Sequence, residues 1–258
     1  MDCVIIAGGL PGPDDPIYVY TQGKPKALLD MHGRTLLERV VDAVQESKYI
    51  EDVIIVGLGS DMGMRFKRPV IHLPDHGSLV KNGTAGLDWI IQNKPQTTHV
   101  LGASGDVPLL SGAIIDDLID TCRPFDYGVY YNFVTRETME KRFPHSSRTY
   151  VKLKGLEVAG GDVAILTTQL GREQELLEML ASARKHAWKI ARIVGLRMLL
   201  KLLFRRVTLT DIEATAQRLT GFPVKILLNP HAEAGMDVDK PHQVDLMRDE
   251  LKKMEIER

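Results

Sequence analysis

The apolar residues of the first half of the chain fall into short runs separated by longer stretches with helical spacing. The runs at residues 3–7, Val53–Gly57, Val70–Leu73 and His99–Ser104 have the length of buried strands. Helices are expected between them, from a capping box at Thr35–Glu38 to about Ser47, from Ser78 to Gln92, and over 112–122. This alternation predicts a mostly parallel sheet with right-handed crossovers.

The second half is less regular. Strand-like runs at Gly128–Val134, Thr149–Leu153, Val163–Thr167 and Val224–Leu228 are expected to include an antiparallel element, and helices are expected from a capping box at Thr210–Glu213 to about Gly221 and over Pro241–Glu257. No repeat or low-complexity linker divides the chain. We therefore expect one α/β domain over residues 1–258, with a Rossmann-like, mixed but mostly parallel sheet, helices on both faces and a helical insertion.

Composition narrows the class of protein without identifying it. The 258 residues are 44% hydrophobic and 26% charged, as in a soluble globular protein. The net charge of −1 gives no reason to expect a nucleic-acid partner. Two cysteines, Cys3 and Cys122, argue against a disulfide framework. The N-terminus lacks the pattern of a signal peptide, so the cytoplasm is the expected location.

A glycine turn and a lysine pair are the first candidate chemistry. The apolar run 3–7 stops at Ala7-Gly8-Gly9, where the lack of Cβ atoms allows backbone N–H groups to approach a ligand. Lys24 and Lys26 follow in Gly-Lys-Pro-Lys and supply mobile positive charge for phosphate oxygens. Together these segments predict a nucleotide phosphate pocket.

Two acidic segments are candidates for a metal site. Asp106 stands at the end of a predicted strand, where a carboxylate either binds Mg²⁺ or caps the next helix. In Asp237-Val238-Asp239 the two carboxylates are expected to point to opposite sides, so that only one reaches a metal near Asp106. The alternative for Asp239 is a helix cap before Lys240-Pro241.

Four motifs in order carry a resemblance to a known family. They are Ile5-Ile6-Ala7-Gly8-Gly9, Lys24-Pro25-Lys26-Ala27-Leu28-Leu29, Gly105-Asp106-Val107-Pro108-Leu109-Leu110 and Asp237-Val238-Asp239-Lys240-Pro241. The chain resembles the molybdopterin-guanylyltransferase-like (MobA-like) branch of the nucleotidyltransferase superfamily, which also contains sugar-1-phosphate nucleotidyltransferases. The resemblance implies a fold like that of nucleotide-diphospho-sugar transferases, with a nucleotide-binding half over 1–125 and an acceptor-binding half over 126–258.

The resemblance also implies roles for individual residues. Catalysis would fall to Lys26 and Asp106, Mg²⁺ binding to Asp106 and Asp239, and nucleotide binding to Ala7, Gly8, Gly9, Lys24, Lys26, Gly77 and Ser78. Gly160-Gly161-Asp162 resembles an acceptor-side loop, in which Asp162 either binds acceptor hydroxyls or makes a turn. Arg148–Lys152 either faces the acceptor or forms an ordinary strand.

One departure from the family pattern concerns the signature loop. Leu10–Gln22 is long, contains Pro11, Pro13 and Pro16, and lacks the arginine that usually precedes the lysine. Lys24 would replace that arginine in part, although an ammonium does not reproduce bidentate guanidinium geometry. The expected activity is Mg²⁺-dependent transfer of NMP from an NTP to a phosphorylated small-molecule acceptor with release of pyrophosphate. The alternative is a noncatalytic nucleotide-binding or membrane-surface regulatory protein that retains the fold.

A basic segment at 184–206 contains no acidic residue and interleaves apolar with basic positions. It is too interrupted by charge to span a bilayer. Three interpretations compete for it: a helical lid over the core, a helix on an anionic membrane surface, or a contact in a homodimer.

Overall fold

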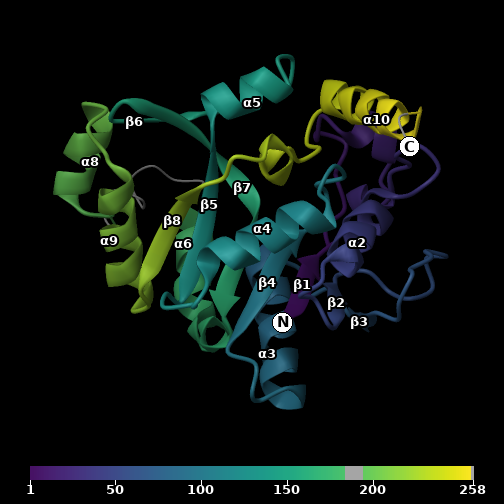
Figure 1. Cartoon of the computed structure of the whole chain (residues 1–258), viewed down its shortest axis with the longest axis horizontal. Helices are drawn as coiled ribbons and strands as arrows, with labels where there is room; N and C mark the ends of the chain where they lie inside the picture. The colour runs from purple at the N-terminus through teal and green to yellow at the C-terminus, as the bar shows by residue number, and fades with distance from the viewer. Residues whose placement is uncertain (184–193, 257–258) are drawn as a thin grey trace.

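The computed structural model describes residues 1–183 and 194–256, which form a mixed sheet with helices on both faces (Figure 1). The strands are β1 (Asp2–Ile6), β2 (Val53–Val56), β3 (Ile71–Leu73), β4 (His99–Ser104), β5 (Val129–Thr135), β6 (Val151–Leu153), β7 (Leu156–Thr167) and β8 (Val224–Leu228). Their order is β3-β2-β1-β4-β7-β5-β8, with β6 paired to β7.

The sheet changes direction beside β4. Strands β1 to β4 pair in parallel, as the alternating first half predicts. β7 runs antiparallel to both β4 and β5, and β8 returns parallel to β5. The expected Rossmann-like, mixed but mostly parallel sheet is therefore confirmed. The carboxyl end of β4 lies beside β7, which runs in the opposite direction.

The helices follow the strands along the chain. They are α1 (Tyr18–Thr21), α2 (Leu36–Glu46), α3 (Leu79–Asn93), α4 (Gly112–Cys122), α5 (Arg136–Arg142), α6 (Gln174–Ala183), α8 (Leu196–Leu203), α9 (Leu209–Thr220) and α10 (Pro241–Ile256). Within the described ranges, none of these helices has the length and apolarity needed to cross a bilayer.

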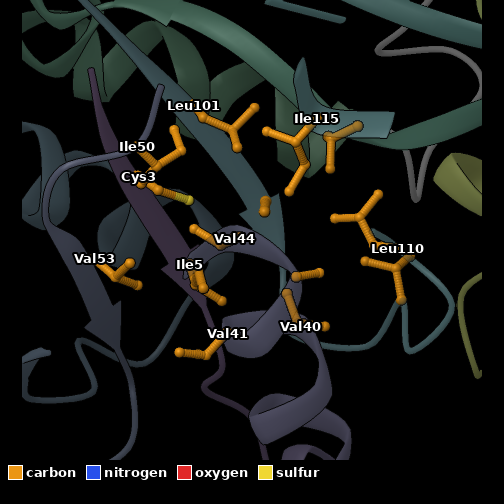
Figure 2. Close-up of a cluster of buried hydrophobic side chains, with 14 of the residues drawn as sticks. Cys3, Ile5, Val40, Val41, Val44, Ile50, Val53, Leu101, Leu110 and Ile115 are labelled. Atoms are coloured by element: carbon orange, nitrogen blue, oxygen red, sulfur yellow. The ribbon is translucent and has the colours of Figure 1, made fainter. Parts of the chain in front are cut away.

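Side-chain alternation along β1 explains why both faces are covered. Cys3 and Ile5 point into a cluster that includes Val40 and Val44 of α2 (Figure 2). Val4, between them, points to the other face and packs with Leu87 of α3. A strand buried on both faces is continuously apolar, as residues 3–6 are.

Helix starts test the capping predictions directly. The box at Thr35 is confirmed, because its side chain accepts from the Glu38 amide at 3.1 Å while Glu38 accepts from the Thr35 amide at 2.8 Å. The start at Ser78 is confirmed too. The box predicted at Thr210–Glu213 is wrong: Thr208 caps α9 and Asp211 takes the reciprocal position. Aspartate two residues earlier than the expected glutamate fills the same role.

The strand predicted at Val163–Thr167 begins earlier in the chain than expected. Gly160-Gly161-Asp162, expected as a loop before a strand at Val163–Thr167, lies inside the twelve-residue strand β7. Glycine is required there by close packing, since a Cβ on Gly161 would lie 2.1 Å from the Asn132 amide oxygen. The strand expected at Thr149–Leu153 is shorter and begins at Val151.

The long loop 10–22 and the C-terminal helix are packed together at one edge of the sheet. Ile17 is buried in a cluster with Val244 and Met247 of α10. The Tyr20 hydroxyl donates to the Asp245 carboxylate at 2.7 Å, and the Arg248 guanidinium lies over the Tyr20 ring. Ten residues of the basic segment, 184–193, lie outside the described residues; its remaining part forms α8 and the turn after it.

Candidate functional site

The ends of two neighbouring parallel strands bring the first two candidate motifs together. β1 and β4 pair along their length, with Ile6 opposite Ser104. The Gly105 amide donates to the Ile6 carbonyl at 2.9 Å, so the glycine turn and Asp106 leave the sheet side by side. This is the edge at which open α/β sheets bind ligands.

The glycine turn offers two backbone donors. The Ala7 N–H extends the ladder by donating to the Val56 carbonyl at 2.9 Å, so it is not available to a ligand. The amides of Gly8 and Gly9 donate to nothing in the described part of the chain. Gly9 has φ +110°, a conformation that L-residues rarely adopt. Gly57 packs so closely that a Cβ there would lie 2.4 Å from the Gly8 amide nitrogen.

A buried asparagine fixes the loop that faces the glycine turn. The Asn82 side-chain amide donates to Asp75 at 2.8 Å and accepts from the His76 amide at 2.7 Å. The Gly77 amide also donates to Asp75, at 3.0 Å. The hydrogen bond from Asn82 is the main reason that the pKa of Asp75 lies below its usual value. A Cβ on Gly8 would lie 2.5 Å from the Asn82 amide nitrogen, so the two loops touch.

Gly77 and Ser78 therefore lie beside the turn with their polar groups partly engaged, and their contact with a nucleotide stays a prediction. The Ser78 hydroxyl accepts from the Lys81 amide at 3.1 Å and caps α3. A loop that enters a helix N-terminus next to a glycine turn has the geometry of a site for anionic groups. Asp75 and Asn82, which hold this loop, are residues that the sequence patterns did not single out.

Lys26 connects the other two motifs. Its ammonium forms ion pairs with Asp106 and, at 2.7 Å, with Asp239. The Val238 amide donates to the Asp106 carbonyl at 3.2 Å, which holds the C-terminal segment against the end of β4. Residues 213 positions apart in the sequence are thus joined at one point.

Neither aspartate acts as a helix cap. Ser111 caps the helix after Asp106 by accepting from the Ile114 amide. Ahead of α10, the Gln243 side chain accepts from the amides of Asp239 and Lys240, both at 2.9 Å, so the Asp239 carboxylate is free to face Lys26. Helix capping, the alternative stated for both residues, is therefore excluded, and their role in metal binding stays a prediction.

The charge balance at Lys26 favours the ammonium form. Burial is the largest single influence and lowers its pKa, but the carboxylates of Asp106 and Asp239 together raise the pKa well above the ordinary lysine value. The lysine side chain is 23% exposed and Asp106 is 13% exposed, whereas Asp239 is 58% exposed. The site thus opens to solvent on the Asp239 side.

A second cation, Arg148, lies among the remaining carboxylates. Its guanidinium pairs with Asp237, lies 3.8 Å from Asp162 and donates to the Gly160 carbonyl at 3.3 Å. Asp237 and Asp239 face different partners, which confirms that alternation separates their carboxylates. Arg148 precedes β6 rather than lying in a strand.

Asp162 belongs to the same group of charges. Burial, and then repulsion from Asp106, raise its pKa to about 7, against a lowering influence of Arg148. Val163 pairs with Ala103, so Asp162 lies next to the end of β4, and the charges of Asp106, Asp239 and Lys26 also influence its pKa. A strongly perturbed carboxyl group at such an edge is typical of functional sites.

The donors present suit Mg²⁺. Asp106 Oδ1 and Asp162 Oδ2 are buried and have no hydrogen-bond partner among the described residues. No three His, Cys, Asp or Glu side chains within residues 1–183 and 194–256 form a complete metal-binding group. Mg²⁺ is commonly held by one or two carboxylates together with waters and substrate phosphates, so Asp106 and Asp239 match its ordinary protein ligands.

Lys24 stands apart from this geometry. It is exposed and forms no ion pair with the described part of the chain, whereas Lys26 is bound on two sides. Of the residues expected at the site, the structure therefore brings Gly8, Gly9, Lys26, Asp106 and Asp239 to one edge of the sheet, with Gly77 and Ser78 beside the turn.

Comparison with known proteins supports the motif resemblance. A family model described as the MobA-like NTP transferase domain matches residues 3–206. A structure described as a hypothetical transferase from Thermus thermophilus is 31% identical, with a TM-score of 0.81 over 94% of this chain and 98% of that one.

Two more distant structures share the fold. The 4-diphosphocytidyl-2C-methyl-D-erythritol synthase from Anaerococcus prevotii is 13% identical, with a TM-score of 0.57 over 97% of this chain and 95% of its own. The 2-C-methyl-D-erythritol 4-phosphate cytidylyltransferase from Thermus thermophilus is 17% identical, with a TM-score of 0.53 over 97% of this chain and 98% of its own.

Proposed function

Because this chain belongs to the MobA-like NTP transferase family and is a nucleotidyltransferase, we propose that it transfers NMP from an NTP to a phosphorylated small molecule. Pyrophosphate would be the second product and Mg²⁺ the metal. The observation that carries the proposal is the position of Lys26, whose ammonium joins Asp106 and Asp239 next to the Gly8-Gly9 turn.

The proposed reaction is a displacement at the α-phosphorus. A phosphate oxygen of the acceptor forms the new bond to the α-phosphorus, and the bond from that phosphorus to the oxygen bridging to the β-phosphate breaks. Pyrophosphate leaves with the electron pair of the broken bond. A phosphate monoester, whose second pKa is about 6, is already dianionic at neutral pH, so the attack needs no general base.

The residues of the site would act through charge and alignment. The amides of Gly8 and Gly9 would donate to phosphate oxygens, and the Lys26 ammonium would follow the phosphate charge as it moves to the leaving group. Asp106 and Asp239 would hold Mg²⁺, which supplies neutralisation of the negative charge that builds up on the phosphates. Keeping two carboxylates beside the lysine preserves the ammonium form that this role requires.

The acceptor side would lie toward β7. Asp162 lies on β7, which runs antiparallel to β4, and Arg148, from the segment before β6, lies 3.8 Å from it. We propose that Asp162 binds acceptor hydroxyls there. The acceptor-phosphate class agrees with the name of the Thermus thermophilus cytidylyltransferase, whose substrate is a 4-phosphate.

The lost arginine of loop 10–22 does not require a noncatalytic protein. The structure ties this loop to α10 through Tyr20 and Ile17. Lys24 is exposed two residues before Lys26, and we propose that it moves to contact phosphate oxygens that Lys26 does not reach. Retention of Lys26, Asp106 and Asp239 in one cluster supports turnover over a regulatory role.

Pyrophosphate detection tests this function. The protein is incubated with each of four NTPs, Mg²⁺ and a panel of phosphorylated sugars, alcohols and pterins. With a competent pair, Asp106→Asn is expected to lower Mg²⁺-dependent release by about 100-fold or more, because it removes one carboxylate charge from the metal site. Asp249→Asn is the matched control, since Asp249 is exposed on α10.

Two results would contradict the proposal. One is release of pyrophosphate by Asp106→Asn at the wild-type rate. The other is transfer that proceeds equally in the presence of excess chelator.

A further inference from the structure

Helix α8 exposes large apolar side chains to solvent. Leu196, Leu203 and Phe204 are 72%, 74% and 65% exposed, and Leu200 and Leu202 are each 46% exposed. Leu196, Leu200 and Leu203 recur at helical spacing, so they form one stripe along the helix. A concentration of this kind within nine residues is unusual on the surface of a folded domain.

The rest of α8 is anchored, which fixes the direction of that stripe. Met198 packs against a cluster of Leu153, Val158 and Val207 beneath the helix. Lys201 forms an ion pair with Asp211 of α9 at 2.5 Å. Since the inward side is already occupied by these contacts, the stripe cannot be buried by a simple rotation of α8.

Unpaired positive charge lies beside the stripe. Arg197, Arg205 and Arg206 are exposed and form no ion pair with the described residues. Together with Leu196, Leu200 and Phe204, Arg197 and Arg206 line a groove of about 400 Å³. The sequence from 184 to 206 contains eight Lys and Arg residues and no acidic one, in a chain whose net charge is −1.

We propose that α8 and the turn after it bind an anionic lipid surface. Apolar residues on one side of a helix with arginines beside them are the pattern of a helix that lies in the membrane interface. The arginines would contact lipid phosphates while Leu196, Leu203 and Phe204 enter the boundary of the acyl chains. The inference does not depend on the proposed transfer reaction.

Charge complementarity favours a membrane over a second copy of the chain. In a symmetric dimer through this surface, α8 would meet the same surface of its partner. The arginines of both copies would then approach one another without intervening carboxylates from 184–206. An anionic bilayer presents the opposite charge and an apolar interior together.

The arrangement of the fold also leaves this surface accessible. α8 and α9 lie at one side of the molecule and α10 at the other (Figure 1). α8 packs on the β6–β7 hairpin, through Leu153 of β6 and Val158 of β7. β7 also carries Asp162, so this hairpin connects α8 with the candidate site. Because α10 lies on the opposite side of the molecule, membrane binding through α8 would leave loop 10–22 and α10 in solvent.

Vesicle sedimentation tests the proposal with the full chain. The protein is expected to pellet with vesicles of equal parts phosphatidylglycerol and phosphatidylcholine at low salt, and to remain in solution with phosphatidylcholine alone. Each arginine replaced by glutamine among Arg197, Arg205 and Arg206 is expected to weaken binding roughly fivefold, or about 1 kcal/mol. High salt should weaken binding of the wild type in the same way.

The apolar contribution is tested with Leu203→Ser/Phe204→Ser, which is expected to reduce binding at least tenfold because about two large side chains no longer enter the interface. Ile256→Ser and Lys252→Gln make the same kinds of change on α10 and should bind like wild type. Circular dichroism and thermal unfolding confirm that each variant is folded.

Two outcomes would overturn the inference. The first is wild-type protein that stays in the supernatant with anionic vesicles at low salt. The second is concentration-dependent dimerisation, abolished by Leu203→Ser/Phe204→Ser, without vesicle binding; this would assign the surface to a second copy of the chain.

Discussion

The Arg148 cluster allows a prediction whose size depends on pH. Arg148 is 13% exposed, and its partners Asp237 and Asp162 are 14% and 21% exposed. Arg148→Met keeps most of the volume of the side chain and removes its charge. The variant leaves two carboxylates in a buried environment without their nearest cation.

Removing one partner from a buried ion pair costs about 3–5 kcal/mol of unfolding free energy, mostly because the remaining charge is not compensated. We expect this full cost for Arg148→Met at about pH 8, which is above the pKa of about 7 of Asp162, so that this carboxyl group is ionised. The cost should be smaller at about pH 5, because Asp162 is then protonated in the folded protein and has no charge for Arg148 to compensate.

The cost of Arg148→Met is larger at the higher pH because the pKa of Asp162 is raised in the folded protein. Burial raises that pKa to about 7, above the ordinary value of 3.8 that the unfolded chain approaches. Between these values the folded protein binds more protons than the unfolded chain, so stability falls as pH rises. Arg148 lowers the pKa of Asp162 and limits this loss. Its removal should therefore cost about 1–2 kcal/mol more at the higher pH.

Urea unfolding of the metal-free protein at the two pH values measures the effect. In thermal unfolding at the higher pH, the midpoint temperature of Arg148→Met should lie about 10 °C below that of the wild type, because each kcal/mol lowers it by about 2–4 °C in a chain of this size. Arg123→Met is the control, because Arg123 is 52% exposed and its ion pair with Asp120 lies at the surface. Equal losses for Arg148→Met at both pH values, or none, would refute the electrostatic reasoning.

Three further changes probe the glycine turn, a helix cap and the site lysine. Gly57→Ala should weaken NTP binding about tenfold or more in calorimetry, because its Cβ would displace the Gly8 amide, and unchanged affinity would show that Gly8 does not contact the nucleotide. Thr208→Ala should cost about 1 kcal/mol in urea unfolding and Thr210→Ala less than about 0.5, and the reverse order would restore the cap predicted from sequence. Lys26→Met should lower the rate of pyrophosphate release about 100- to 1,000-fold, and a variant whose KM alone changed would exclude a role for its ammonium in the reaction step.

Local patterns were sufficient for the first half of the fold. The apolar run of β1, the capping box at Thr35 and the cap at Ser78 each depend on neighbouring residues only, and the structure confirms all three. β7 could not be predicted in the same way. Its glycines suggest a loop, but the space next to Asn132 is what requires them, and that space exists only in the folded sheet.

The site shows the same division. The glycine turn and Asp106 each follow a predicted strand, and the parallel pairing of those strands brings them to one edge; alternation predicted that Asp237 and Asp239 face apart. The motif resemblance placed Asp162 on the acceptor side in a loop, but local patterns could not reveal that it lies within a strand, because its place depends on β7 running antiparallel to β4. Asn82 was missed for a related reason: a buried side-chain amide that supports a loop leaves no periodic signal.

The contact between Tyr20 and Asp245 has a consequence for biosynthesis. These residues are 225 positions apart, yet their hydrogen bond helps to fix the loop that leads to Lys26. A ribosome releases the N-terminal strand and its loop long before α10 has been synthesised. Cotranslational folding can therefore complete the β1–β2 pair early, whereas loop 10–22 must wait for the far end of the polypeptide before it is held in place.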